Sequence, residues 1–242
     1  MATKHKFEII EERENWIAIY KPAGLLSVPD RMQSAPSLKD FLNEKYGKVW
    51  TVHRLDQPTS GIILFAKNED THRYLSMQFE NRLVQKFYVG LVQGITNEKK
   101  GSVTASLMEH ALKKGTYITH AKGKAAHTDY EILHEYGQYS WVRFQIHTGR
   151  THQIRVHMKH IGIPLVCDDI YGTGPTLLLS SIKRKKFKLS KDSEEERPLL
   201  NRLALHAHTL QFNDEDGIEI KIEAPIPKDL RATLQQMEKW SR

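Results

Sequence analysis

A continuous apolar segment, IILFAK at residues 62–67, most restricts the folds open to this chain. A strand without polar alternation has both faces covered, as in the interior of a layered structure. The strands expected around it come in runs, and helices fall irregularly between them. A repeated strand–helix–strand order, which is typical of parallel sheets, is therefore not expected. The pattern predicts an α+β fold with a central, mixed but largely antiparallel sheet flanked by helices.

Alternation and end signals give the remaining elements. Ser37 and Asn68 are expected to cap helices, and Thr151 is expected to cap a short helix that ends at Gly162. The predicted helices are 37–47, 68–82, 151–162 and 229–240. The predicted strands are two between 7 and 21, then 52–56, 62–67, 86–94, 127–136, 139–148, 203–212 and 218–225.

Composition limits the setting of the chain. It has 242 residues and a formal net charge of +7, which favours a polyanionic partner without choosing among RNA, DNA, anionic membrane and acidic protein. The single cysteine, Cys167, cannot form an internal disulfide, and the first residues lack the apolar core of a signal peptide. No apolar run is long enough to span a bilayer. A reducing cytoplasm is the expected location.

The densest chemical signal is VHRLDQPTSG, which begins at Val52. On a strand, Arg54 and Asp56 would point to one face and His53 to the other. A carboxylate beside an arginine, where the strand gives way to a turn, can stay ionised and act as nucleophile or base. The same residues also fit a structural ion pair at a strand end, and taken alone they favour that reading.

A second signal is TGRTHQIRVH, from Thr148. Arg150 would lie at the entrance of a helix and Arg155 one turn further, and two guanidinium groups suit phosphates and carboxylates. His152 and Gln153 add hydrogen-bonding groups at this entrance. The alternative is a solvated basic helix. Tyr88, in the strand KFYVGLVQG, either packs in the core or stacks on an exposed base.

Five segments together resemble the RluA-type RNA pseudouridine synthases. They are YKPAGLLSVP, VHRLDQPTSGIILFAK, QKFYVGLVQG, TGRTHQIRVHMKHIGIPLVCDDIYG and RLALHAHTLQF, in the family's order, and they cover about residues 7–226. The resemblance implies one pseudouridine synthase catalytic domain over 1–242 with an RNA-binding cleft. It also implies conversion of specific uridines in structured RNA to pseudouridine.

The resemblance further implies roles for single residues. Asp56 matches the essential aspartate, which attacks either the ribose or the uracil ring, and Tyr88 matches the tyrosine that packs against the target base. Arg155 resembles the arginine that pairs with the catalytic aspartate. Arg54 matches the arginine that takes the place of the target in the RNA stack, and Arg150 is an expected RNA contact. His53, His152 and Gln153 are further expected substrate-binding residues.

Two features depart from the family. Cys167 stands where the family usually has glycine, which puts the local turn in doubt. Residues 173–201 form a longer and more charged insertion loop than is usual, basic from Lys183 to Lys191 and acidic from Asp192 to Glu196. This loop either is exposed with two charge blocks that screen each other, or binds the RNA backbone through its basic half. The start of the chain resembles the branch without a separate RNA-binding module ahead of the catalytic domain.

No cofactor and no metal are expected. His152 and His157 are five residues apart, and His206 and His208 lack further ligands nearby in the sequence. No phosphate-binding loop is found. The expected partner is RNA, either ribosomal or a transfer-RNA stem-loop, with no membrane and no obligatory protein partner, and the chain is expected to be a monomer. The alternatives are a catalytically idle RNA-binding protein with the same fold, and a nuclease, which would want metal-binding carboxylates.

Overall fold

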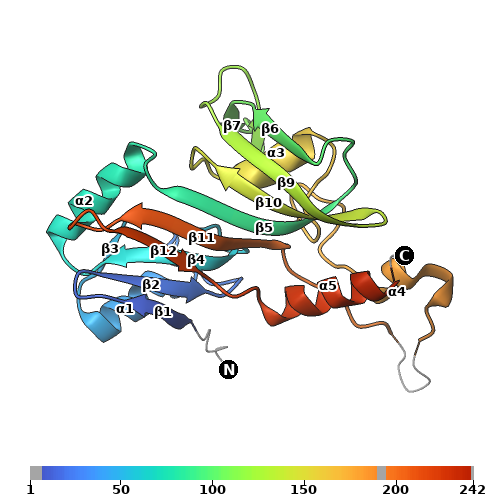
Figure 1. The fold of residues 1–242 in the computed structure, drawn as a ribbon, viewed down its shortest axis with the longest axis horizontal. Helices are drawn as coiled ribbons and strands as arrows, with labels where there is room; N and C mark the ends of the chain where they lie inside the picture. The colour runs from blue at the N-terminus through green and yellow to red at the C-terminus, as the bar shows by residue number, and fades with distance from the viewer. Residues whose placement is uncertain (1–6, 190–194, 241–242) are drawn as a thin grey trace. The chain divides into compact units, whose positions relative to one another are not determined.

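The computed structural model describes residues 7–189 and 195–240, which form two compact units (Figure 1). The first unit comprises residues 1–88 and 206–225, and the second comprises 89–205 and 226–242. The chain therefore passes between the units three times. Strand β5 (Gln85–Gln93) begins in the first unit and continues into the second.

The first unit is a sheet with two helices. Its strands are hydrogen-bonded in the order β1-β2-β4-β11, with β12 beside β11 and β3 beside β4. All of its pairs are antiparallel except β4 with β11, which run parallel. The strands are β1 (Glu8–Glu12), β2 (Trp16–Lys21), β3 (Trp50–Thr51), β4 (Ser60–Ala66), β11 (Leu205–Asn213) and β12 (Glu219–Glu223), and the helices are α1 (Leu38–Tyr46) and α2 (Glu69–Glu80).

Strand β4 is buried along its whole length, as its unbroken apolar sequence predicts. Gly61 begins it with φ +121°, and a Cβ there would lie 2.1 Å from the carbonyl oxygen of Ala207 on β11. Only glycine fits this approach of two backbones. Two apolar clusters cover the strands. One contains Ile62 and Leu64, and the other contains Ile63 and Phe65, so that successive residues of β4 fill opposite faces.

The helix ends in this unit follow their sequence signals. Ser37 caps α1 and forms a reciprocal capping box with Asp40, and Gly47 follows the last turn with φ +74°. Asn68 caps α2, with its side chain accepting a hydrogen bond from the Thr71 amide. These caps were all predicted, because each is decided by residues adjacent in sequence.

The second unit has a four-stranded sheet in the order β5-β10-β9-β6, and a separate hairpin of β7 and β8. Strands β9 and β10 pair along nearly their full length, with an irregularity at Trp141 and Val142. Its other strands are β6 (Lys100–Thr104), β7 (Leu107–Glu109), β8 (Tyr117–Thr119), β9 (His127–Tyr136) and β10 (Tyr139–Ile146), and its helical segments are α3 (Gln153–His160), α4 (Leu179–Lys183), the short 3₁₀ turn η1 (Arg184–Lys186) and α5 (Lys228–Trp240).

The insertion expected to be a loop is partly folded. It carries α4 and η1, and Leu177, Ile182 and Leu200 lie in the same apolar cluster as Leu230 and Met237 of α5. Of its charged residues, Lys191, Asp192 and Glu194 lie outside the described residues, whereas Lys183, Arg184, Lys185 and Lys186 lie within them.

The α+β prediction is confirmed, and three local predictions are wrong. Residues 52–56 form no strand, and the side chain of Ser27 binds both backbone groups of Leu55. Helix α3 begins after His152, which has φ +57°, and Thr151 does not cap it. Strands β6, β7 and β8 were not expected. Within the described residues, no helix is both long and apolar enough to cross a membrane.

Candidate active site

A buried lysine fixes the backbone next to Asp56. Lys21 ends β2 in the YKPAG segment and has no exposed surface. Its ammonium group donates to the carbonyl oxygens of Pro22, Leu25 and Gln57 at 3.0, 2.8 and 3.1 Å. Gln57 is the residue that follows Asp56, so the ammonium joins the turn after β2 to the turn that carries Asp56.

Ser27 makes the second connection. Its hydroxyl donates to the carbonyl of Leu55 at 2.7 Å and accepts from the amide of Leu55 at 3.1 Å. Both backbone groups of Leu55 are therefore satisfied by one side chain, which is what a paired strand would otherwise do. The amide of Thr59 donates to the Asp56 carbonyl and closes the turn. Hydrogen bonds thus hold the backbone on both sides of Asp56.

The charge of Asp56 acts on the phenol of Tyr88, which is half-buried in the first unit. Burial raises the pKa of the Tyr88 phenol above its ordinary value, and the negative charge of Asp56 raises it further. The phenol consequently keeps its proton at neutral pH within the electrostatic influence of a carboxylate. An aromatic ring with a protonated hydroxyl suits both packing against a base and holding a proton.

His53 supports the fold in this unit. Its Nε2 accepts the amide hydrogen of Leu64, and its ring stacks on Phe79 with centroids 4.7 Å apart. Burial lowers the pKa of His53 to about 3, and the positive charge of Lys86 contributes. A neutral imidazole already occupied in this way fits a structural role. Its predicted contact with RNA stays a prediction. Arg54, the next residue, is exposed, as a residue that enters an RNA stack must be.

In the second unit, Arg155 forms a buried ion pair. Its guanidinium donates to both carboxylate oxygens of Asp168 at 2.7 Å, and the two side chains are 1% and 0% exposed. Asp168 also accepts from the amides of Ile170 and Tyr171, each at 3.0 Å. Helix α3 is buried from Gln153 to Met158, so the reading as a solvated basic helix is wrong.

Tyr171 extends this arrangement. Its hydroxyl accepts from the Tyr117 amide at 2.7 Å and lies 2.8 Å from Nδ1 of His152. Its ring lies 5.0 Å from the guanidinium carbon of Arg155. Gln153 is 3% exposed, and its side chain binds the backbone of Arg150 and of His127. Gln153 therefore shapes the start of α3.

Arg150 borders a cavity of about 480 Å³ in the second unit. Its Nε donates to the Ala125 carbonyl at 3.1 Å. Lys122, Lys124 and Tyr117 line the same cavity. Three cationic side chains around one hollow can hold a phosphate group. This geometry supports, without testing, the prediction that Arg150 contacts RNA.

Cys167 shows why glycine is usual at its position. Its φ is +57°, the left-handed region that glycine enters without steric penalty. The thiol is buried and donates to the Leu200 carbonyl, with sulfur and oxygen 3.4 Å apart. Burial raises the pKa of this thiol to about 11. The turn that was in doubt forms with cysteine, and the thiol stays protonated.

One cluster was missed in the sequence. His127 and Asp129 share a face of β9, and His147 lies across from them after β10, with Asp129 oxygens 3.0 and 2.7 Å from the two imidazole nitrogens. It is the one group of three metal-ligand side chains found in the described part of the chain. The two-residue spacing on a strand was the available signal. Lys21, Ser27 and Asp168 were missed too, because each binds a residue from a separate segment of the chain: Gln57, Leu55 and Arg155 respectively.

Comparison with known proteins identifies the family. Residues 15–160 match the model of the RNA pseudouridylate synthase family. An uncharacterised RNA pseudouridine synthase of Chlorobaculum parvum is 36% identical over 95% of this chain and 73% of its own length. The dual-specificity RNA pseudouridine synthase RluA of Vibrio vulnificus is 36% identical over 72% of each chain. The chain belongs to the RNA pseudouridine synthase family, whose members isomerise uridines in RNA.

Coverage of the relatives varies. The chain spans 54% of the length of ribosomal large subunit pseudouridine synthase D from Borreliella burgdorferi, at 37% identity. Among solved structures, human RNA pseudouridylate synthase domain containing 4 matches with a TM-score of 0.74 and 22% identity over 95% of this chain and 92% of that one. The structural likeness shows that the fold is shared.

Proposed function

We propose that this chain isomerises specific uridines in structured RNA to pseudouridine, with Asp56 as the catalytic nucleophile. The observation that carries the proposal is that the charge of Asp56 acts on the half-buried, protonated phenol of Tyr88. Family membership supplies the reaction, and the HRLD segment held by Lys21 and Ser27 supplies a fixed carboxylate. Simple RNA binding has no use for a carboxylate fixed in this way.

The chemistry is balanced without any added reagent. The bond between ribose C1′ and uracil N1 breaks, the base turns, and a bond forms from C1′ to C5. The proton on C5 is lost and N1 gains one, so nothing is oxidised, hydrolysed or donated. Asp56 attacks either the ribose or the uracil ring, and Tyr88 packs against the base. We therefore propose that the enzyme uses no cofactor and no metal.

The arginines are proposed to serve the RNA. Arg54 takes the place of the target uridine once the nucleotide leaves its stack, as base-modifying enzymes require. Arg150 holds a phosphate, with His152 and Gln153 shaping the same helix entrance. Arg155 is proposed as the partner of Asp56 from the family resemblance alone, and within its own unit its guanidinium is held by Asp168.

The substrate class follows from the relatives. Their printed names include ribosomal large subunit and dual-specificity enzymes. We propose large-subunit ribosomal RNA, a transfer-RNA stem-loop, or both, modified in the cytoplasm by a monomer without an obligatory protein partner. Mapping pseudouridines in RNA from cells with and without this protein identifies the positions.

Replacing Asp56 with asparagine tests the proposal. The Asp56→Asn protein should bind RNA with nearly unchanged affinity and make no pseudouridine, because an amide cannot supply the ionised carboxylate. The readout is pseudouridine formed per protein molecule in a purified reaction. Asp70→Asn, the same change at an exposed site on α2, is the control and should keep full activity. Substantial turnover by Asp56→Asn would instead favour an RNA-binding protein whose Asp56 has no catalytic role.

A further inference from the structure

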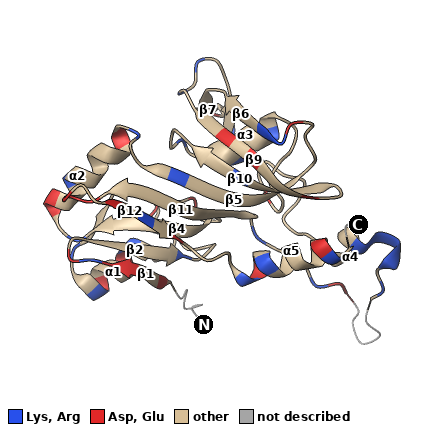
Figure 2. Cartoon of the chain, viewed as in Figure 1, with Lys and Arg blue, Asp and Glu red and all other residues tan. Residues whose placement is uncertain are grey.

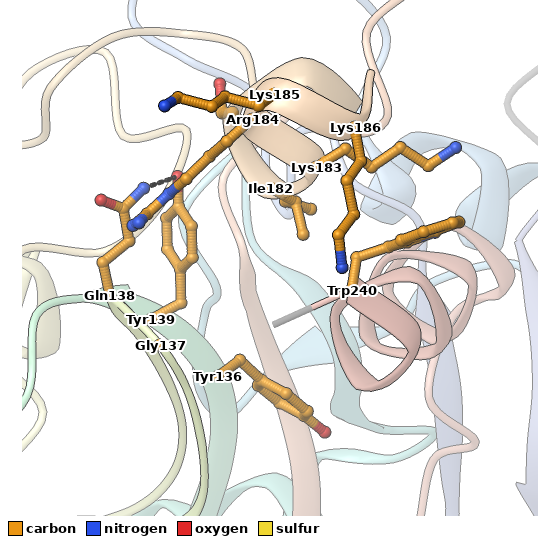
Figure 3. A pocket seen from close by; sticks show the side chains of 11 residues that line it. Tyr136, Gly137, Gln138, Tyr139, Ile182, Lys183, Arg184, Lys185, Lys186 and Trp240 are labelled. Carbon is orange, nitrogen blue, oxygen red and sulfur yellow. Dashed lines mark hydrogen bonds between the residues drawn. The ribbon is translucent and has the colours of Figure 1, made fainter. Parts of the chain in front are cut away.

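The second unit holds a cavity that the proposed chemistry does not use. It has a volume of about 590 Å³, within the range of small-ligand sites. It is formed by the turn between β9 and β10, by α4 and η1 of the insertion, and by the last residue of α5 (Figure 3). Its side chains include Tyr136, Gln138, Tyr139, Ile182 and Trp240.

Four consecutive basic residues line this cavity, from Lys183 to Lys186, and none of its described lining residues is acidic. In Figure 2 they form an unbroken blue stretch of ribbon over α4 and η1. Figure 3 places Arg184 on the side of Gln138 and Tyr139, and Lys186 on the side of Trp240. Cations therefore approach the cavity from two sides, which suits an anion that lies between them.

Aromatic groups accompany the cations. The ammonium of Lys183 lies 4.3 Å from the Trp240 ring centroid, and the Trp240 indole donates to Gln236. The Gln138 amide donates to the Tyr139 hydroxyl at 3.1 Å. Glu238 is the acidic residue whose charge reaches Tyr136. Basic side chains together with aromatic rings are typical of sites for single-stranded nucleic acid, where phosphates meet cations and bases meet rings.

We propose that this cavity, lined by Lys183–Lys186 and Trp240, binds an unpaired nucleotide of RNA. Arg184 and Lys186 hold its phosphates, and Trp240 contacts its base. The site reads no sequence, because phosphate contacts position RNA without discriminating bases. The inference rests on the proposed function and deepens it, because the bound nucleotide would belong to the RNA on which the enzyme acts. It also gives the charged insertion a definite ligand.

A matched pair of double variants tests the site. Arg184→Gln with Lys186→Gln removes one arginine and one lysine from the cavity, and both positions are exposed, so folding is unaffected. Lys228→Gln with Arg231→Gln removes the same charges from exposed positions on α5. The measurement is the affinity of the full chain for a single-stranded uridine-free RNA hexamer over a range of salt concentrations.

The cavity variant should bind the hexamer about tenfold more weakly, and its plot of log affinity against log salt should be flatter by about 1.4, since each single-strand phosphate contact contributes about 0.7. The control should change affinity less than threefold. Trp240→Leu should weaken binding about fivefold or more, since it removes a base contact while keeping an apolar side chain. Equal effects of the two double variants would overturn the proposal.

Three further arms identify the ligand. A duplex of the same length should compete poorly, and adenosine monophosphate or inorganic phosphate should compete only at much higher concentration. An acidic peptide that competes as well as the hexamer, with no effect of Trp240→Leu, would assign the cavity to protein and overturn the proposal. Because these arms involve no turnover, they stand apart from the test at Asp56. Inactive wild-type protein with cavity-dependent binding would sink only the catalytic proposal.

Discussion

At the scale of single residues, chemistry depends on groups kept in one protonation state. Burial and the charge of Asp56 both hold the pKa of Tyr88 above its ordinary value, so this phenol keeps its proton near neutral pH. Burial holds His53 neutral in the same unit. The environment of Tyr88 keeps its phenol protonated. The environment of His53 keeps its imidazole neutral, so that Nε2 accepts the Leu64 amide hydrogen.

Substitutions at Tyr88 separate the ring from the hydroxyl. Tyr88→Phe should retain RNA affinity and lower the single-turnover rate about 10²-fold, because it removes only the O–H. Tyr88→Ala should also weaken RNA binding by about 1–3 kcal/mol through loss of a stacked ring. Single-turnover rates and dissociation constants for the two variants are the measurements. If Tyr88→Ala reacts like the wild type, Tyr88 belongs only to the core.

The ion pair of Arg155 and Asp168 offers a second test at this scale. Asp168→Asn should lower the free energy of unfolding by about 3 kcal/mol, because a buried guanidinium loses its charged partner. Asp169→Asn should cost under about 1 kcal/mol, since that carboxylate is 70% exposed and 3.4 Å away. Urea unfolding of both variants gives the comparison, and similar losses would show that the buried pair contributes nothing special.

At the scale of elements, the site depends on a segment without secondary structure. The alternation of VHRLD predicts a strand, but Ser27 makes the hydrogen bonds to Leu55 that a neighbouring strand would supply, and Lys21 binds the carbonyl of the following Gln57. The helices capped by Ser37 and Asn68 were predictable, because each cap involves residues three positions apart. The partners of Lys21, and of Arg155, were not, because only the fold brings these distant residues together.

Ser27 provides the test of this element. Ser27→Ala leaves both backbone groups of Leu55 without their partner, which should lower the free energy of unfolding by about 1–3 kcal/mol. It should also lower the rate of isomerisation about tenfold at saturating RNA, through misplacement of the adjacent Asp56. Ser34→Ala, in an exposed turn with Asp30, serves as the control and should change neither quantity. Unchanged activity in Ser27→Ala would show that Asp56 is positioned by other contacts.

At the scale of the whole molecule, neutral buried histidines make stability depend on pH. His53 has a folded-state pKa of about 3 against about 6.5 in the unfolded chain, so the unfolded chain binds more protons between these values. Its contribution to stability is complete above pH 6.5 and is lost as the pH falls toward 3. By pH 5 the loss should be about 2 kcal/mol. The pKa of His157 and of His208 is lowered by burial as well, which acts in the same direction.

Denaturant unfolding at pH 7 and pH 5 measures this loss. His53→Gln keeps an acceptor for the Leu64 amide and carries no titrating group, so its stability should fall less between the two pH values by about 2 kcal/mol. His120→Gln, at an exposed histidine of the second unit, is the control and should follow the wild type. Parallel curves for wild type and His53→Gln would show that His53 titrates normally.

The two units alternate along the chain, and this order decides when each unit can fold during synthesis. The first unit takes its parallel strand and its neighbour from residues 206–225, so its sheet stays incomplete while the ribosome makes the 117 residues between Tyr88 and His206. Domains tend to fold in the order of translation, but the edge of β4 stays unpaired until its partner β11 has been made. A nascent chain paused before His206 would hold Asp56 in place only through its local hydrogen bonds. Catalytic competence would then arrive late in translation, after the second unit has most of its sequence.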